Sequence, residues 1–239
     1  MGQQKLKRFA EFISFPNCFD FPYNLKGKWK TEVFKNNKPL VIELACGKGE
    51  YTVNLAKQDP SSNFIGIDIK SNRMWKGAGI SQELGLTNTG FVRMSIQKIN
   101  MFFEPGEVDE IWITFPDPFP KDRHEKNRLT HPEFLTFYKN IIKQGGIVNF
   151  KTDDDGLFDY TLETLNNVGI KPIEVIKDVH NEPHNYDHLR NITTHYEKLF
   201  SNKGRKIKYC KFNLDTLNYL PKPVVFENII PNQFKINKP

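Results

Sequence analysis

The sequence has few cysteines and no long hydrophobic run. Its three cysteines, Cys18, Cys46 and Cys210, are widely spaced and form no C-x-x-C pair, which argues against a disulfide framework and against a zinc site. No stretch approaches the roughly 18 apolar residues of a membrane span, and the first residues lack the apolar core and cleavage site of a signal peptide. We therefore expect a protein of the reducing cytoplasm with no membrane partner.

The chain has enough length and apolar content for a substantial core. Its 239 residues are 38% hydrophobic, which suits one α/β domain with additions better than two independent domains. The formal net charge of +6 favours a polyanionic partner, although charge alone does not separate nucleic acid from membrane headgroups. The composition leaves monomer and homodimer open.

Apolar runs alternate with helical patterns through most of the chain. Strands separated by helices imply parallel pairing with right-handed crossovers, so we predict a doubly wound, mostly parallel three-layer α/β sandwich. We expect helix N-caps at Ser71 and Thr130. The predicted strands cover 39–45, 63–69, 91–95, 108–115, 147–152, 173–179 and a segment near 205–212, and the predicted helices cover 5–13, 50–58, 71–84, 130–142 and 156–167.

The two ends of the chain differ from this alternating pattern. Residues 1–37 are basic, aromatic and turn-rich, and residues 213–239 are rich in proline and asparagine. We therefore predict an amino-terminal arm, one α/β domain over 38–212, and an extended carboxy-terminal segment that packs on that domain. Ligands of doubly wound folds bind at the carboxyl ends of the strands.

The first predicted strand is followed by a glycine-containing turn. Gly47 and Gly49 in "ELACGKGE" lack Cβ atoms, so the backbone can approach a ligand closely. Asp68 ends the second predicted strand, where a carboxylate receives the two ribose hydroxyls of an adenosine. Each feature alone has a plain structural explanation, such as a strand-to-helix turn, but together they predict a nucleoside cofactor.

Glu43 separates two classes of cofactor. A dinucleotide fingerprint requires a third glycine at the position of Thr52 and favours no acid inside the strand. A buried carboxylate needs a cationic or donor partner, and the sulfonium and ammonium of S-adenosylmethionine carry positive charge. We therefore favour S-adenosylmethionine over a nicotinamide cofactor. The alternative is that Glu43 is a strand-end acid bonded to loop amides.

The segment "TFPDPFPK" leaves the fourth predicted strand, at 108–115, through three prolines. Proline fixes φ and prevents the strand from continuing, so we expect Asp117 and Lys121 to be held in a stiff loop above the sheet.

Five segments together resemble one enzyme family. They are "ELACGKGE", "GIDI", "FPDPFPKDRHEKNRLTHPEF", "FKTDDDGLF" and "TTHYEKLFSNKG", and they are similar to segments of the bacterial tRNA (guanine-N7-)-methyltransferases over about residues 38–212. The resemblance implies transfer of a methyl group from S-adenosylmethionine to a guanine in the variable loop of tRNA.

The resemblance also implies roles for individual residues. Its cofactor acids fall on Glu43, Asp68 and Asp117, and its substrate-contacting positions fall on Lys121, Asp153, Thr194, His195, Tyr196 and Glu197. Two positions depart from the family. Ser95 stands where the family often has an acid, so we expect its hydroxyl or backbone to contact the cofactor, and Phe119 replaces the usual tryptophan. We expect catalysis from Asp117 and Asp153. Either carboxylate can accept hydrogen bonds from the guanine edge, and our hypothesis is that Asp153 binds the base while Asp117 lies between base and cofactor.

Two basic runs accompany these motifs. Residues 121–130 include Lys121 and Arg123, and residues 203–208 carry four further cations. Such runs are often solvated faces, but near the functional edge we expect them to bind phosphate.

The last predictions concern three histidines, the segment 194–197 and two alternative functions. His180, His184 and His188 have i, i+4 spacing, but Pro183 lies among them, so we predict polar loop residues and no metal site. The 194–197 segment has a second interpretation as a plain helix start. The alternatives to the enzyme are a catalytically inactive RNA-binding protein on the same fold and, less favoured, a nicotinamide-dependent oxidoreductase.

Overall fold

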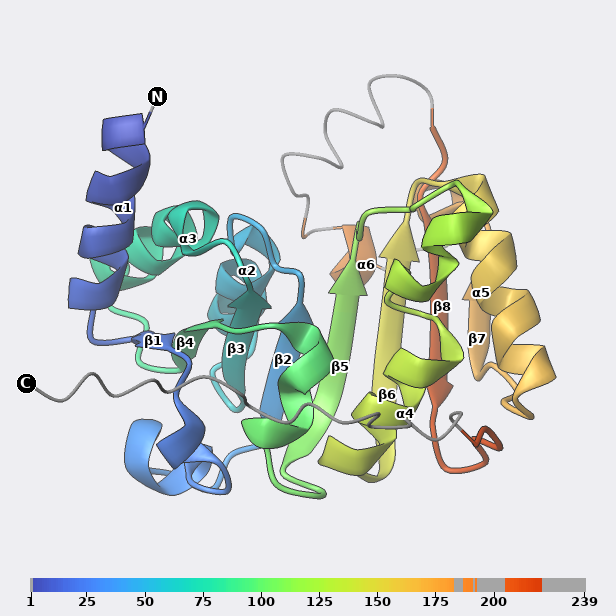
Figure 1. Ribbon diagram of the computed structural model, residues 1–239, viewed down its shortest axis with the longest axis horizontal. Helices are drawn as coiled ribbons and strands as arrows, with labels where there is room; N and C mark the ends of the chain where they lie inside the picture. The colour runs from blue at the N-terminus through green and yellow to red at the C-terminus, as the bar shows by residue number, and fades with distance from the viewer. Residues whose placement is uncertain (1, 183–186, 191, 193–204, 221–239) are drawn as a thin grey trace, which may run out of the picture.

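The computed structural model describes residues 2–182, 187–190, 192 and 205–220, and they form one sheet with helices on both faces (Figure 1). The strands are β1 (Cys18–Asp20), β2 (Leu40–Leu44), β3 (Asn63–Asp68), β4 (Thr89–Arg93), β5 (Val108–Thr114), β6 (Ile142–Thr152), β7 (Glu174–Ile176) and β8 (Lys208–Asn213). The α-helices are α1 (Gly2–Ser14), α2 (Glu50–Gln58), α3 (Ser71–Glu83), α4 (Pro132–Ile141), α5 (Asp155–Asn167) and α6 (Asp187–Arg190). Short helical turns are η1 (Tyr23–Leu25), η2 (Trp29–Val33), η3 (Ile96–Met101), η4 (Asp122–Asn127) and η5 (Val179–Asn181).

The strands are ordered β1-β4-β3-β2-β5-β6-β8-β7. Every pairing between β1 and β6 is parallel, whereas β8 is antiparallel to both β6 and β7. The prediction of a doubly wound, mostly parallel sandwich is therefore confirmed. Because β8 runs opposite to its neighbours, its first residue lies at the edge where the other strands end, which is the upper edge in Figure 1.

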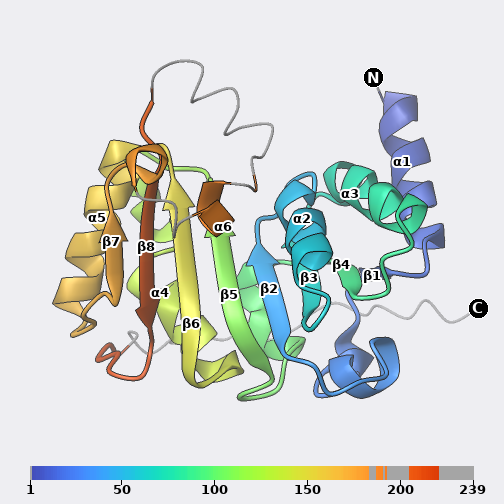
Figure 2. The ribbon, with the colours of Figure 1, turned by 180° about the vertical axis from the view of Figure 1, so that it is seen from behind.

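Apolar side chains explain the three layers. All five residues of β2 are buried, as expected for a central parallel strand covered on both faces. One face packs against η3, α4 and α5, which lie in front of the sheet in Figure 1. Helices α2, α3 and α6 cover the other face, seen in Figure 2, and α1 packs on α3.

Two predicted helix caps are wrong by one residue. Helix α3 has Lys70 at its N-cap position, because the Asp68 carboxylate accepts the backbone N–H of Lys70 at 2.8 Å and sets the preceding turn. Helix α4 is capped by His131, whose Nδ1 accepts the N–H of Glu133. The Thr130 hydroxyl instead forms a buried hydrogen bond with that of Thr161.

The amino-terminal region contains a strand that the sequence did not predict. Strand β1 pairs in parallel with β4, and its ladder is extended by hydrogen bonds from Phe91 N–H to Asn17 and from Phe21 N–H to Arg93. The proposed division at residues 37 and 212 remains a prediction, and most of the carboxy-terminal segment, 221–239, lies outside the described residues.

Candidate active site

A cleft of about 570 Å³ opens at the carboxyl edge of the parallel strands. Its lining comes from the ends of β2, β3, β4, β5 and β6, as the position rule for doubly wound sheets predicts. The predicted residues that line it are Glu43, Gly47, Asp68, Ser95, Asp117 and Asp153. These residues are widely separated in the sequence, and the fold brings them to one cavity.

The turn between β2 and α2 has an unusual backbone. Ala45, Gly47 and Gly49 all have positive φ, at 56°, 57° and 70°. A Cβ on Gly49 would lie 2.5 Å from Cε1 of Phe91, so this position excludes other residues on both conformation and space. Gly49 does not itself line the cleft; it allows the turn to pack on the sheet while the neighbouring backbone faces the cavity.

Asp68 holds two loops at the end of the cleft that is formed by β2 and β3. Its Oδ2 accepts the N–H of Gly47 at 3.0 Å, and its Oδ1 accepts the N–H of Lys70 at 2.8 Å. The residue is buried yet lines the cleft. One carboxylate therefore sets the positions of the turns that follow β2 and β3.

Glu43 is a buried carboxylate without an ion pair among the described residues. It accepts hydrogen bonds from the Thr52 N–H at 2.9 Å, from the Thr52 hydroxyl, and from the Thr114 hydroxyl at 2.6 Å. Burial raises the pKa of Glu43 to about 7, although the hydrogen bonds oppose that shift. Thr52 lies in the first turn of α2, so the partners are a helix amide and two hydroxyls, not the loop amides of the alternative interpretation.

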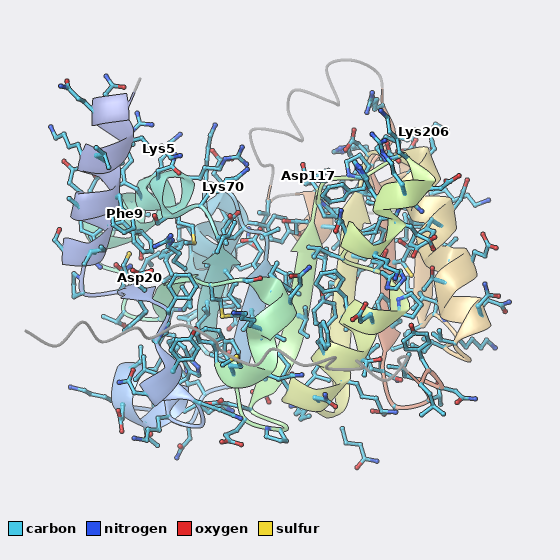
Figure 3. The ribbon with its side chains drawn as sticks, in the orientation of Figure 1. Lys5, Phe9, Asp20, Lys70, Asp117 and Lys206 are labelled. Atoms are coloured by element: carbon cyan, nitrogen blue, oxygen red, sulfur yellow. The ribbon has the colours of Figure 1, made fainter. Side chains whose placement is uncertain are left out.

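The chain leaves β5 through two strained residues. Phe115 and Phe119 have φ values of 48° and 44°, a region that bulky side chains rarely occupy. The N–H of Phe115 donates to the Lys151 carbonyl oxygen, and Arg128 donates two hydrogen bonds to the Phe119 carbonyl oxygen. These bonds hold the prolines and the exposed Asp117 at the rim, where Figure 3 shows Asp117 at the upper edge.

A buried lysine lies beneath this segment. Lys151 is completely buried, and its ammonium donates to the Leu189 carbonyl oxygen at 2.6 Å. The same ammonium lies over the rings of Tyr51 and Phe115, at 5.5 and 5.7 Å from their centroids. Lys151 thus connects α2, α6 and the exit from β5, a role that its place in "FKTD" did not reveal.

Asp153 follows β6 and is paired with a residue that the site prediction omitted. Arg205 Nη1 donates to Asp153 Oδ2 at 2.7 Å, and both residues line the cleft. Arg205 belongs to the basic run at 203–208, which was the only indication of its role. It lies just before β8, whereas the rule for doubly wound sheets predicts site residues in segments that follow strands.

The remaining predicted residues lie away from the cavity or outside the described residues. Lys121 and Arg123 are exposed at η4 and do not line the cleft. Thr194, His195, Tyr196 and Glu197 are not among the described residues, and neither is His184. Within the described ranges, no helix is long and apolar enough to cross a membrane.

The strand order and the position of the cleft define the class: this is a Rossmann-like methyltransferase fold. A solved structure titled "Structure of an Antibiotic Related Methyltransferase" matches with a TM-score of 0.58 at 19% identity, covering 76% of this chain and 90% of that one. The family model described as a putative methyltransferase matches residues 37–210.

Two related proteins identify the methyltransferase family more specifically. A tRNA (guanine-N(7)-)-methyltransferase of Christiangramia forsetii is 43% identical over 221 residues, which cover 89% of this chain and 99% of that protein. The protein of the same name from Cytophaga hutchinsonii is 44% identical over 218 residues, covering 89% and 98%. The chain belongs to this methyltransferase family, as its motifs predicted.

Proposed function

We propose that the protein transfers a methyl group from S-adenosylmethionine to N7 of a guanine in the variable loop of tRNA, in the cytoplasm. The observation that carries this proposal is that Glu43, Asp68 and Asp117, from the ends of three strands, line one cleft. The names of the relatives support the tRNA substrate.

The cofactor end of the cleft fits S-adenosylmethionine. The cavity volume lies within the usual range for small-molecule sites, and the Asp68 carboxylate, anchored by two backbone amides, retains lone pairs for two ribose hydroxyls. Glu43 offers a buried negative charge to a ligand that carries two positive charges. When bound, this cofactor supplies an electrophilic methyl group on a sulfonium sulfur.

The chemistry requires alignment more than proton transfer. The bound cofactor would supply the methyl carbon and its sulfur would keep the electron pair of the broken bond, so guanine N7 would gain the methyl group through its own lone pair. N7 carries no proton, so a general base is unnecessary. Holding the nucleophile at contact distance in a water-poor cleft lowers the barrier by several kcal/mol, on the order of 7–11 at best.

We assign this alignment to Asp153 and Asp117. The Asp153 carboxylate accepts hydrogen bonds from guanine N1–H and the amino group, which fixes the ring and stabilises its developing positive charge. Asp117 lies between base and cofactor on its strained loop. Lys121 and Arg123 remain exposed for RNA phosphates, and Thr194, His195, Tyr196 and Glu197 are proposed substrate contacts on the family resemblance.

Mass spectrometry of modified nucleosides tests the proposal directly. tRNA incubated with the protein and a labelled methyl donor should contain labelled 7-methylguanosine at one variable-loop position. The reaction should also weaken steeply between low and high salt, because each phosphate contact adds to the salt dependence. A label on another atom, or no label despite tight cofactor binding, would contradict the proposal.

A further inference from the structure

The contact between Arg205 and Asp153 joins a cation to the carboxylate that we assign to the substrate guanine. The two side chains are 2.7 Å apart, and they differ in exposure: 9% for Asp153 and 52% for Arg205. The buried acid therefore stays in place, whereas the arginine reaches in from the solvent side. A charged pair of this kind is strong enough to compete with a neutral ligand.

Guanine and the arginine side chain present the same donor pattern. In guanine, N1 and the amino nitrogen are bonded to one carbon atom, and their N–H groups point side by side in the same direction. Two N–H groups of a guanidinium are arranged in the same way. A carboxylate that accepts one of these groups is shaped to accept the other. Arg205 occupies Oδ2 of Asp153 at 2.7 Å. A two-point contact with guanine needs both carboxylate oxygens, so the guanine competes with Arg205 for Oδ2.

We propose that Arg205 is a specificity-determining residue that occupies the Asp153 carboxylate in the free protein, releases it to the substrate guanine, and then pairs with an RNA phosphate. This inference rests on the proposed function, since it takes Asp153 as the acceptor of the guanine edge. It assigns to Arg205 an exchange of the Asp153 carboxylate for an RNA phosphate, two groups of the same sign of charge.

The exchange explains how the site distinguishes tRNA from free guanine nucleosides. A nucleoside that displaces Arg205 separates an ion pair and offers the guanidinium no new anion. A guanine within RNA brings neighbouring phosphates, so the ion pair that is lost at Asp153 is replaced. Free guanosine is thus disfavoured by the arginine, while tRNA is favoured by it.

The test compares guanosine, whose binding Arg205 should weaken, with tRNA, whose binding Arg205 should strengthen. In Arg205→Gln, guanosine should inhibit tRNA methylation about tenfold more strongly than in the wild-type protein, because its competitor for Asp153 is gone. The same variant should bind tRNA several-fold more weakly, and its log affinity should fall less steeply with log salt, by about 0.7–0.9 for one lost phosphate contact. Inosine, which lacks the amino group, should gain less than guanosine.

Lys206→Gln is the matched control. Lys206 neighbours Arg205 in sequence and lies at the same edge as Asp117 in Figure 3, but it pairs with Asp178 at 3.8 Å. Among the described residues, Asp153 is paired with Arg205 and not with Lys206. The Lys206→Gln substitution removes one positive charge, as Arg205→Gln does, so it tests whether tRNA binding responds to net charge alone. Guanosine inhibition should match the wild-type value in this variant.

Arg205→Lys keeps the charge but loses the planar donor pair, so guanosine inhibition should lie between the other two values. Thermal unfolding and cofactor binding of each variant identify any that fail to fold. Guanosine inhibition that is unchanged or weaker in a folded Arg205 variant, including inhibition too weak to measure in every form, overturns the inference. Loss of the proposed function is a separate outcome, since it would show as no 7-methylguanosine formed by the wild-type protein.

Discussion

The two halves of the cleft use their acids differently. In the cofactor half, Asp68 and Glu43 accept hydrogen bonds from backbone amides and threonine hydroxyls of the chain itself. In the substrate half, Asp117 is exposed on a strained loop and Asp153 is paired with a half-exposed arginine. The acids of the first half are held by groups of the chain itself, whereas in our proposal Asp153 of the second half exchanges its partner.

This difference reflects the two ligands. A small cofactor gains affinity from groups that are already positioned, because little ordering is lost on binding. A tRNA brings many phosphates and can replace an existing ion pair. Variants in the cofactor half should therefore alter folding and cofactor affinity, and variants in the substrate half should alter the rate of methyl transfer.

The largest effect is expected at the substrate acids. Asp117→Asn and Asp153→Asn should each lower the single-turnover rate about 100- to 1000-fold, because each removes a charge that aligns the base or stabilises its developing cation. For Asp153→Asn, cofactor affinity measured by calorimetry should change less than about threefold. Rates near the wild-type value for both variants would contradict the roles that we assign to them.

The next largest effect is a loss of folding stability expected at Gly49, in the turn after β2. Gly49→Ala should lower the free energy of unfolding by about 2–4 kcal/mol, since its Cβ would meet Phe91 and its φ is positive. Gly85→Ala is the control, because φ is 64° there but no atom lies within 4 Å of the added Cβ. We expect a loss of only about 1 kcal/mol for the control. Equal losses in urea denaturation would show that space beside Phe91 is irrelevant.

A pH-dependent effect is expected at Glu43. Its folded pKa of about 7 lies above the ordinary value of 4.5, so the folded state binds the proton more tightly. The stability from this group is complete below about pH 4.5 and is lost as the pH rises to 7, by up to about 3 kcal/mol. The unfolding free energy of wild type minus that of Glu43→Gln should fall across this window.

The Glu43 carboxylate should also make the affinity for the cofactor depend on pH. A cationic ligand favours ionised Glu43, so cofactor affinity of the wild-type protein should rise by up to about tenfold between pH 6 and 8. Glu43→Gln should show a flat profile in calorimetry. A parallel rise in both proteins would assign the pH dependence to another group.

The smallest effect is expected at Asp68. Asp68→Asn retains one acceptor oxygen, so one of the two loop amides loses its partner, and cofactor affinity should fall about tenfold with about 1 kcal/mol of stability. The methyl-transfer rate at saturating cofactor should stay within a few-fold of wild type. A rate loss as large as that of Asp153→Asn would remove the distinction between the two halves.

The sequence predicted the cofactor half better than the substrate half. Gly47 and Asp68 lie at the ends of parallel strands and line the cleft, so local patterns located them, whereas Gly49 shapes the turn without lining the cleft. Arg205 was missed because it precedes an antiparallel strand, and strand direction is set by pairing with β6 and β7. The hydrogen bond between Glu43 and Thr114 joins residues 71 positions apart, and no local pattern reveals it.

The prolines after β5 predicted that the chain turns there, but they did not predict the backbone conformation of the turn. The positive φ of Phe115 and Phe119 depends on their bonds to Lys151 and Arg128, which come from other segments. Strand β1 was missed because three residues between turns show no periodicity. Local sequence therefore gave the elements, while tertiary contacts set the strained geometry.

The short strand β1 bears on how the enzyme can be shortened. Since β1 supplies the outer hydrogen bonds of β4, a protein trimmed to start at residue 38 would leave the amide and carbonyl groups of β4 without partners along one side of the sheet. Exposed edges of this kind recruit strands from other molecules. Such a trimmed enzyme should self-associate, and the first 37 residues are better regarded as a protective border of the sheet.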